Sequence, residues 1–257
     1  MSPSVLAVIP ARLESARLPR KLLLSRTGRP VLQHTWEAAA AIDSIDEVVV
    51  ATDSPEIADV VQSFGGTVVM TGSHRTGTDR IAEAVTTMGS SHEIVVNIQG
   101  DEPDMTAGPV NALLTVLHDH PDTDIATAGA PFRSLEELND PGCVKAVCTH
   151  DGRALYFSRA MIPSALLSGT RELIAENFPA LRHIGLYGFR REVLLSWSKL
   201  PVSPLEQIES LEQLRPLQAG HVIRLAAVES HPPGIDFPHD YEAFVDRWFQ
   251  LHGESGP

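Results

Sequence analysis

Four cations lie within ten residues near the start of this chain, directly after an apolar segment. The segment IPARLESARLPRKL, residues 9–22, contains Arg12, Arg17, Arg20 and Lys21, and between them the small residues Ala11, Ser15 and Ala16. A loop of this composition can wrap a polyphosphate with backbone N–H groups and guanidinium forks. A solvated basic loop without any site has the same composition, so this segment alone leaves both interpretations open.

Two acidic stretches could supply a metal partner for such a phosphate site. The stretch QGDEP, residues 99–103, places Asp101 directly after an apolar run, and GIDFPHD, residues 234–240, contains Asp236. Carboxylates suit Mg²⁺, a hard ion that takes oxygen ligands together with substrate phosphates. The structural alternatives are a turn at 99–103 and a helix cap near 236, for which Asp240 is the better candidate.

A glycine-containing turn, TGTDRIAEA at residues 76–84, opens a predicted helix. Backbone N–H groups at a helix start can bind phosphate or read the edge of a base. Taken by itself, the stretch favours a plain helix start with Thr78 as the capping residue.

The elements that must position these stretches alternate along the first half of the chain. We predict strands at residues 4–9, 47–51, 67–70 and 93–98, and helices at 31–41, 55–64, 79–88 and 105–117. Apolar, β-branched strands between helices are typical of a parallel sheet covered on both faces. Ligand sites of such sheets lie in the loops at the carboxyl ends of strands, where residues 9–22 and 99–103 fall.

The second half predicts a more mixed arrangement. Strands are expected at 124–131, 144–158 with a turn at 151–152, 184–189 and 222–228, and helices from 190 to 200, 210–218 and 240–251, with loop and helix at 166–178. We find no repeat, low-complexity block or clear linker. The expected fold is therefore a single α/β domain with an inserted or appended antiparallel part.

Composition excludes several classes of protein. The 257 residues have no apolar run that reaches the ~18–20 residues of a membrane span, and the N-terminus lacks the basic lead of a signal peptide. Cys143 and Cys148 lie in one predicted strand and at its end, so we expect no disulfide and a reduced, cytoplasmic setting. A formal charge of −13 argues against nucleic-acid binding, and we expect neither a nucleic-acid nor a membrane partner.

Seven motifs, taken together in chain order, resemble the 3-deoxy-manno-octulosonate cytidylyltransferase (CMP-Kdo synthetase) family. They are IPARxxSxRLPxK, TGTDR, QGDEP, ALYFSRAMIP, RHIGLYGFR, SPLEQIESLEQLR and GxDxPxD, and the resemblance extends from about residue 5 to residue 244. The first, third and last are shared with the wider sugar nucleotidyltransferase group. Those at residues 154–163, 182–190 and 203–215 are much more specific.

The resemblance implies a fold and a reaction. The fold would be a Rossmann-like, mostly parallel sheet flanked by helices, of the nucleotide-diphospho-sugar transferase type, with an antiparallel dimerisation part. Residues 1–132 and 216–257 would mainly form the nucleotide and metal core, and 133–215 the sugar-binding and homodimerisation part. The reaction would transfer CMP from CTP to the anomeric 2-hydroxyl of 3-deoxy-D-manno-octulosonate (Kdo) with Mg²⁺, for lipopolysaccharide or related glycan synthesis.

The family also implies residue roles on the nucleotide side. Lys21, Arg12 and Asp101 would be catalytic, with Lys21 as a point charge on the phosphate under attack. Asp101 and Asp236 match the magnesium ligands. The residues that match the nucleotide site are Ala11, Arg12, Ser15, Arg17, Lys21, Thr76, Gly77, Thr78, Arg80, Gln99 and Gly100. No protein nucleophile is expected, because in-line transfer needs positioning and charge stabilisation more than covalent help.

The acceptor side is implied in the same way. The residues that match the sugar-acid site are Gln99, Arg159, His183, Tyr187, Glu212 and Gln213. Among them Arg159 suits the carboxylate, since a guanidinium can bind it through two hydrogen bonds, and the others suit hydroxyls.

Departures from the family pattern keep alternatives open. Arg20 stands where the family often has Gly, Phe237 and His239 replace the commoner Thr and Glu, and residues 164–177 differ freely. The acceptor could therefore be another acidic sugar or a phosphonate. A non-catalytic nucleotide-binding homologue is a further alternative, although the motif residues are intact. The absence of GxGxxG argues against a dinucleotide-binding oxidoreductase.

Overall fold

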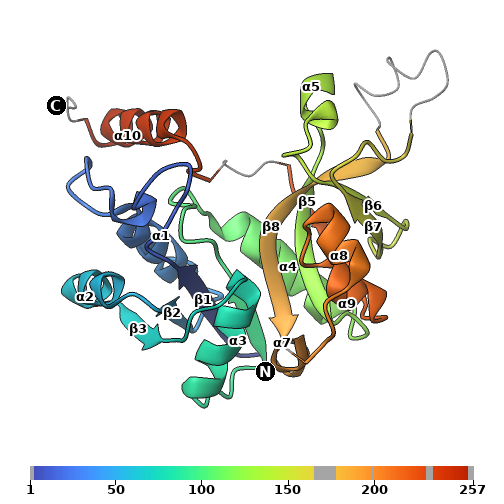
Figure 1. The fold of residues 1–257 in the computed structure, drawn as a ribbon, viewed down its shortest axis with the longest axis horizontal. Helices are drawn as coiled ribbons and strands as arrows, with labels where there is room; N and C mark the ends of the chain where they lie inside the picture. Colours follow the sequence, from blue (N-terminus) through green and yellow to red (C-terminus); the bar gives the residue numbers. More distant parts are fainter. Residues whose placement is uncertain (1–2, 165–177, 198, 230–233, 254–257) are drawn as a thin grey trace. The chain divides into compact units, whose positions relative to one another are not determined.

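The computed structural model describes residues 3–164, 178–197, 199–229 and 234–253, and the contacts of the chain group them into two units (Figure 1). Unit 1 combines Met1–Ala107 with Pro232–Pro257, and unit 2 is Gly108–His231. The division by function that the sequence predicted, at 132–133 and 215–216, stays a prediction, because these units are defined by contacts alone.

Unit 1 contains a parallel arrangement of β1 (Val5–Ala11), β2 (Glu47–Thr52), β3 (Thr67–Met70) and β4 (Ile94–Asn97). β1 is central: it pairs with β2 on one side and with β4 on the other, and β3 pairs with β2. Leu6 to Ile9 are fully buried, since both faces of this strand are covered. The predicted parallel sheet is confirmed, and the loops after β1 and β4 lie at the same edge because the two strands run side by side in one direction.

The helices of unit 1 follow the predicted order. They are α1 (Val31–Ala40), α2 (Pro55–Ser63), α3 (Gly77–Thr87) and α10 (Pro238–His252), with a short 3₁₀ helix, η1, at Lys21–Leu23. Ser54 caps α2 by accepting a hydrogen bond from the Ile57 backbone, and Pro55 at the first position suits a helix start.

The predicted cap of α3 was wrong, whereas Asp240 does cap the start of α10, as the sequence predicted. Thr76, not Thr78, caps α3, since its Oγ1 accepts from the Asp79 backbone at 3.1 Å. Thr78 is buried inside the first turn. Asp240 lies two residues into α10, and its carboxylate accepts from the backbone N–H groups of Asp236 at 3.0 Å and Phe237 at 2.8 Å. Asp240 therefore supplies an acceptor for the free backbone N–H groups at the helix start from inside the helix. The Asp236 side chain is left for other contacts.

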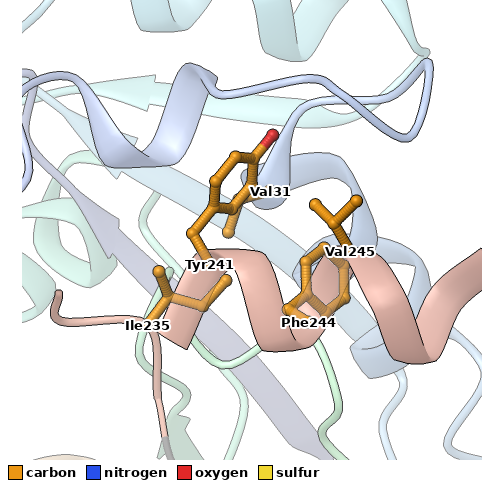
Figure 2. Packing of buried hydrophobic residues seen from close by; sticks show 5 residues of the cluster. All are labelled: Val31, Ile235, Tyr241, Phe244 and Val245. Carbon is orange, nitrogen blue, oxygen red and sulfur yellow. The ribbon is translucent and has the colours of Figure 1, made fainter. Parts of the chain in front are cut away.

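An apolar cluster fastens α10 to α1. Figure 2 shows Tyr241, Phe244 and Val245 of α10 beside Val31 of α1 and Ile235 of the preceding loop. All five are buried, and Phe244 is only 2% exposed. The cluster places the loop that carries Asp236, because Ile235, the residue before it, belongs to the same packing.

Unit 2 contains a mixed arrangement of strands. β5 (Ile125–Ala130) lies between β8 (Ala180–Arg190), which is antiparallel to it, and β9 (Ile223–Ala227), which is parallel. β6 (Lys145–Cys148) pairs antiparallel with β7 (Ala154–Ser158) and with β8. The predicted antiparallel part is thus present, and the strand expected at 144–158 is a hairpin of two strands.

The helices of unit 2 are α4 (Ala107–Asp119), α5 (Leu135–Asn139), α7 (Arg191–Trp197), α8 (Pro204–Glu209) and α9 (Leu214–Gln218). The helix predicted at 210–218 was wrong in its start. Ser203 and Glu206 form a capping box that begins α8 earlier. Ser210 has a φ of 53°, a left-handed conformation that ends α8 and separates it from α9. Most of the segment predicted as loop and helix at 166–178 lies outside the described residues.

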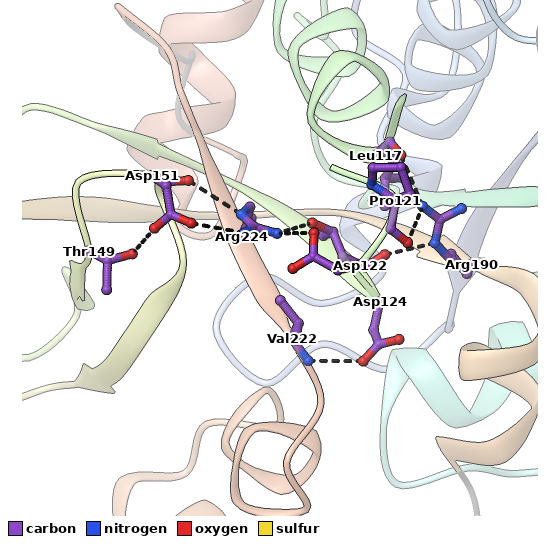
Figure 3. A network of polar contacts seen from close by, with 10 residues as sticks. Leu117, Pro121, Asp122, Asp124, Thr149, Asp151, Arg190, Val222 and Arg224 are labelled. Carbon is purple, nitrogen blue, oxygen red and sulfur yellow. Dashed lines mark hydrogen bonds and ion pairs between the residues drawn. The ribbon is translucent and has the colours of Figure 1, made fainter. Parts of the chain in front are cut away.

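A polar network ties the turn after β6 to the strands of unit 2 (Figure 3). Arg224 of β9 donates to the carboxylates of Asp122 and Asp151, both at 2.9 Å. Hydrogen bonds from Thr149 and Arg224 hold the pKa of Asp151 well below its usual value. Arg190 donates to main-chain carbonyls at the end of α4, including that of Leu117 at 3.0 Å.

Two expectations from composition can be compared with the described residues. Cys143 and Cys148 are free thiols, so the prediction that they form no disulfide is confirmed. Burial raises the pKa of both thiols. No helix in the described ranges has both the length and the apolar character that a membrane crossing requires.

Candidate active site

An open cavity of about 430 Å³ lies in unit 1, between the loop after β1, the loop after β4 and the loop before α10. This volume is within the range of about 300–1,000 Å³ that is usual for small-molecule sites. The sequence-predicted residues that line it are Arg12, Ser15, Arg17, Lys21, Gln99, Gly100, Asp101 and Asp236. The cavity therefore brings together the cationic loop and both candidate metal carboxylates.

Lys21 joins the two predicted metal carboxylates. Its Nζ forms a close ion pair with Asp101 Oδ2 and lies 3.1 Å from Asp236 Oδ1. It also donates to the main-chain carbonyl of Ile235 at 3.0 Å. Two carboxylates from distant parts of the chain thus converge on the Lys21 ammonium. A metal ion bound to the same carboxylate oxygens would have to compete with this ammonium.

The backbone holds these two carboxylates in register. The Ile235 N–H donates to the Asp101 carbonyl at 2.8 Å, so the loops of Asp101 and Asp236 are bonded directly. Gly100 permits the approach of the neighbouring segments. A Cβ at this position would lie 3.3 Å from the Pro10 carbonyl oxygen and 3.4 Å from the Leu22 side chain.

Arg17 extends the cationic side of the cavity and explains the unusual residues of the late loop. Its Nη2 lies 3.0 Å from Asp236 Oδ1, and its guanidinium carbon lies 5.0 Å from the centre of the Phe237 ring. Phe237 in turn stacks on His239, with ring centres 5.4 Å apart. An aromatic ring facing a guanidinium attracts it, so this pair of rings supports Arg17 beside Asp236. Sequence reasoning missed this role, although the position of Phe237 next to Asp236 was a signal.

Arg12 differs from the other cations of the cavity. Its side chain is exposed at the cavity wall. Within the described part of the chain, it has no hydrogen-bond or ion-pair partner, so its guanidinium is available to a bound anion.

Arg20 does not line the cavity, although it belongs to the same loop. It forms a close, exposed ion pair with Glu56 of α2. Its φ of 55° and ψ of 29° are left-handed, a conformation that Gly adopts without strain. This explains why Gly suits the position.

Replacing Arg20 by Gly and by Ala should separate backbone strain from the ion pair. Both variants lose the contact with Glu56, but only Gly relieves the left-handed conformation. We expect Arg20→Gly to be more stable than Arg20→Ala by about 1 kcal/mol. Urea unfolding measures the difference in the free energy of unfolding between the two variants. Equal values would show that the left-handed backbone at Arg20 is not strained.

The turn predicted to read the base lies beside the cavity but outside its described lining. A Cβ at Gly77 would lie 3.5 Å from the Pro10 side chain, which lines the cavity. Arg80 is buried, with its guanidinium 3.1 Å from Asp53 Oδ2 and 2.8 Å from Thr71 Oγ1. Thr76, Gly77, Thr78 and Arg80 therefore form one turn, and Arg80 holds it to the ends of β2 and β3. Ala11 is buried at the end of β1.

Apart from Gln99, the residues predicted for the acid sugar belong to unit 2, and two of them are neighbours on β8. The rings of His183 and Tyr187 have their centres 5.5 Å apart, and His183 Nε2 lies 2.9 Å from Thr127 Oγ1. Burial lowers the pKa of His183 to about 3 and raises that of Tyr187, so both side chains are neutral near pH 7. They are suited to hydrogen bonds with hydroxyls and not to binding a charge.

The remaining acceptor residues meet at the break between α8 and α9. Arg159 follows β7, and its guanidinium donates to the carbonyls of Glu209 at 2.8 Å, Ser210 at 3.3 Å and Pro141 at 3.0 Å. Gln213 is 4% exposed, and its Nε2 has no hydrogen-bond partner among the described residues. A buried amide N–H without a partner is costly in a native structure, so a ligand hydroxyl at Gln213 would satisfy it.

The lowered pKa of His183 predicts acid sensitivity. The imidazole is neutral in the folded chain down to about pH 3, whereas in the unfolded chain it takes up a proton below about pH 6.5. Stability should fall as pH decreases from about 6.5, by up to about 1 kcal/mol per pH unit for this group. Urea unfolding between pH 7.5 and 5 measures the slope, and His183→Gln should reduce it. An equal slope of stability against pH in His183→Gln would contradict the prediction. His34→Gln is the matched comparison, because burial also lowers the pKa of His34.

Comparisons with known proteins agree with this arrangement. A family model described as "Cytidylyltransferase" matches residues 6–224. The curated 3-deoxy-manno-octulosonate cytidylyltransferase of Rhodopirellula baltica is 47% identical, over 93% of this chain and 96% of its own length. The 8-amino-3,8-dideoxy-manno-octulosonate cytidylyltransferase of Shewanella halifaxensis is 39% identical, over 92% of this chain and 95% of its own length.

Solved structures resemble the chain over nearly its whole length. A CMP:2-keto-3-deoxy-manno-octonic acid synthetase complexed with CTP superposes with a TM-score of 0.88 at 40% identity, covering 96% of this chain and 99% of that chain. A cytidylyltransferase from Leptospira borgpetersenii, at 15% identity, has a TM-score of 0.62 over 98% and 94% of the two chains. The second likeness concerns the fold alone.

Proposed function

Because this chain belongs to the cytidylyltransferase family, and within it to the 3-deoxy-manno-octulosonate cytidylyltransferases, we propose that it transfers CMP from CTP to the anomeric 2-hydroxyl of Kdo and releases pyrophosphate. The observation that carries the proposal is the convergence of Asp101 and Asp236 on Lys21 in a cavity that Arg12 and Arg17 also line. Cations and carboxylates at one place suit a ligand that brings both negative charge and a metal.

A divalent cation fits the donors of this cavity. The described residues contain no group of three or more His, Cys, Asp or Glu side chains that could hold a metal without help. Asp101 and Asp236 supply two carboxylates, which is the usual protein contribution to Mg²⁺ when phosphate oxygens and water complete the coordination. When bound there, Mg²⁺ would offset phosphate charge and lower the pKa of a coordinated hydroxyl.

The residues of the cavity suit an in-line displacement. Arg12 and Arg17 would bind the phosphates of CTP, and Ser15 and the main chain of the loop would orient them. The 2-hydroxyl gives up its proton to solvent and its oxygen forms a bond to the α-phosphorus, while the bond between the α-phosphorus and the bridging oxygen breaks. Lys21 stabilises the charge that develops on the α-phosphate oxygens, and pyrophosphate leaves.

The acceptor residues suit an acid sugar with several hydroxyls. Gln213 has a buried amide donor to offer, and Gln99 lines the nucleotide cavity. The neutral side chains of His183 and Tyr187 bind hydroxyls better than charges. Arg159 uses three of its N–H groups on main-chain carbonyls, and its remaining N–H donors suit the sugar carboxylate.

Magnesium dependence, a homodimer in the cytoplasm and a place in lipopolysaccharide or related glycan synthesis belong to the same proposal. Their support is the family to which the chain belongs. Size-exclusion chromatography with light scattering tests the dimer, and addition and removal of Mg²⁺ test the metal.

The deciding experiment is pyrophosphate release from CTP and Mg²⁺, with Kdo, 8-amino-Kdo, a sialic acid or no acceptor, repeated with ATP, GTP and UTP. Release that requires both CTP and Kdo supports the proposal. Release with CTP and only 8-amino-Kdo would keep the reaction and change the acceptor, which the relative at 39% identity makes the leading alternative. Folded protein that releases none with any pair would favour a non-catalytic nucleotide-binding homologue.

A further inference from the structure

Lys145 is a buried cation in unit 2 that the proposed reaction does not use. It lies on β6 and its side chain is 0% exposed. Its Nζ donates to two main-chain carbonyl oxygens, that of Asp140 at 2.7 Å and that of Arg159 at 3.0 Å. It forms no ion pair with any carboxylate of the described residues.

Stability does not account for a lysine at this position. Removing an ammonium from water is costly, and neutral carbonyls offset that cost less well than a carboxylate does. The same burial lowers the pKa of Lys145. An apolar side chain of similar length would avoid burying a charge but would release both carbonyls, so we look for the reason for this lysine in the geometry that its two hydrogen bonds fix.

The two carbonyls belong to segments that Arg159 also connects. Lys145 holds the carbonyl of Asp140, and the Arg159 guanidinium holds that of the next residue, Pro141, at 3.0 Å. One turn is therefore bound at two successive carbonyls by two cations. Because Lys145 also binds the Arg159 carbonyl, both the main chain and the side chain of Arg159 are fixed relative to this turn.

Arg159 also binds the main chain at the break between α8 and α9. Its guanidinium binds the carbonyls of Glu209 and Ser210, and the Glu209 carboxylate binds Ser158 Oγ at 2.7 Å and the Arg159 N–H at 2.9 Å. Ser210 is the left-handed residue that ends α8. Holding its carbonyl sets the direction of the chain that continues into Glu212 and Gln213.

We propose that Lys145 is a positioning residue for the acid-sugar acceptor, which it acts on through Arg159 and the Ser210 turn. The inference rests on the proposed function, since the acceptor residues Glu212 and Gln213 are assigned by it. Lys145 itself touches no reacting atom. Its contribution is to hold the guanidinium of Arg159 and the buried amide of Gln213 in one arrangement.

Steady-state kinetics of Lys145→Met tests the proposal. We expect the KM for the acid sugar to rise about tenfold or more, because small displacements of binding groups have effects of this size. The KM for CTP should change by less than about twofold, since every proposed nucleotide residue lies in unit 1. The unfolding midpoint in urea should change only modestly, because the variant removes a buried ammonium but leaves two carbonyls without this donor.

Arg224→Met is the matched control. Arg224 is also a buried cation of unit 2, but its partners are Asp122 and Asp151, in the network of Figure 3. This variant should lose stability and keep both KM values. An unchanged sugar KM in Lys145→Met, or a rise in the two KM values together, would overturn the positioning role. If Lys145→Met does not fold, Lys145→Gln keeps one donor, and its sugar KM should still rise several-fold.

A second readout separates this inference from the proposed function. Backbone hydrogen exchange at residues 209–213 should become faster in Lys145→Met and stay unchanged in Arg224→Met. If the wild type transfers CMP to no acid sugar, the proposed function fails, while faster exchange would still show that Lys145 holds the Ser210 turn. Unchanged exchange together with normal sugar KM would reject Lys145 as a positioning residue in a working enzyme.

Discussion

Replacing Asp101 by Asn is expected to lower kcat for CMP transfer by about 10³-fold at saturating CTP and Kdo. Asp101 forms the close ion pair with Lys21 and is one of the two carboxylates that converge at the cavity. The amide removes one negative charge from the proposed metal site and leaves Lys21 with only Asp236 as a carboxylate partner. Pyrophosphate release at several Mg²⁺ concentrations measures the loss, and excess metal should restore only part of it.

Asp104→Asn is the control for this change. Asp104 lies three residues further along the same segment, pairs with Arg247 at 2.7 Å and is partly exposed. It is absent from the described lining of the cavity. This variant should keep kcat within about twofold, because surface ion pairs contribute little. If the Asp101 variant is folded and keeps more than a tenth of the wild-type rate, Asp101 is not a metal ligand in this reaction.

The largest expected effect on stability is that of Phe244→Ala, a loss of about 3–5 kcal/mol in the free energy of unfolding. Phe244 is almost fully buried between α10 and α1, and its ring lies 5.2 Å from that of His34. Its removal leaves a cavity in the cluster of Figure 2, which other side chains can fill only in part. Urea unfolding measures the loss, and Trp248, which packs against the cluster, reports local loosening by fluorescence.

Tyr241→Phe is the matched change in the same cluster. It keeps the ring and removes the hydroxyl that accepts a hydrogen bond from the Arg26 N–H at 2.8 Å. The expected loss is about 1 kcal/mol. A loss below about 1 kcal/mol for Phe244→Ala would show that the cluster does not hold α10. The activity of Phe244→Ala is also expected to respond more weakly to Mg²⁺, because α10 positions the loop that carries Asp236.

Local patterns of the sequence were sufficient for the elements of unit 1. Apolar, β-branched runs such as residues 47–51 predict strands, and the helices between them require a parallel sheet because parallel strands need crossover connections. The same patterns placed residues 9–22 and 99–103 in loops at the carboxyl ends of strands, where ligand sites of such sheets lie. The motif order was enough to predict the family. Such features depend on residues that are near neighbours in sequence.

The tertiary structure decided which side chains face one another. Nothing local relates Asp236 to Lys21, 215 positions away; packing of α10 on α1 brings them together. Arg159 donates hydrogen bonds to three main-chain carbonyls, and the Phe237 ring supports the Arg17 guanidinium. Both arrangements likewise join segments that are far apart in the chain. The break at Ser210 was missed for a similar reason: its left-handed backbone is stabilised by a guanidinium 51 residues away. The sequence by itself determined the elements and the chemistry available, and long-range packing determined where that chemistry is assembled.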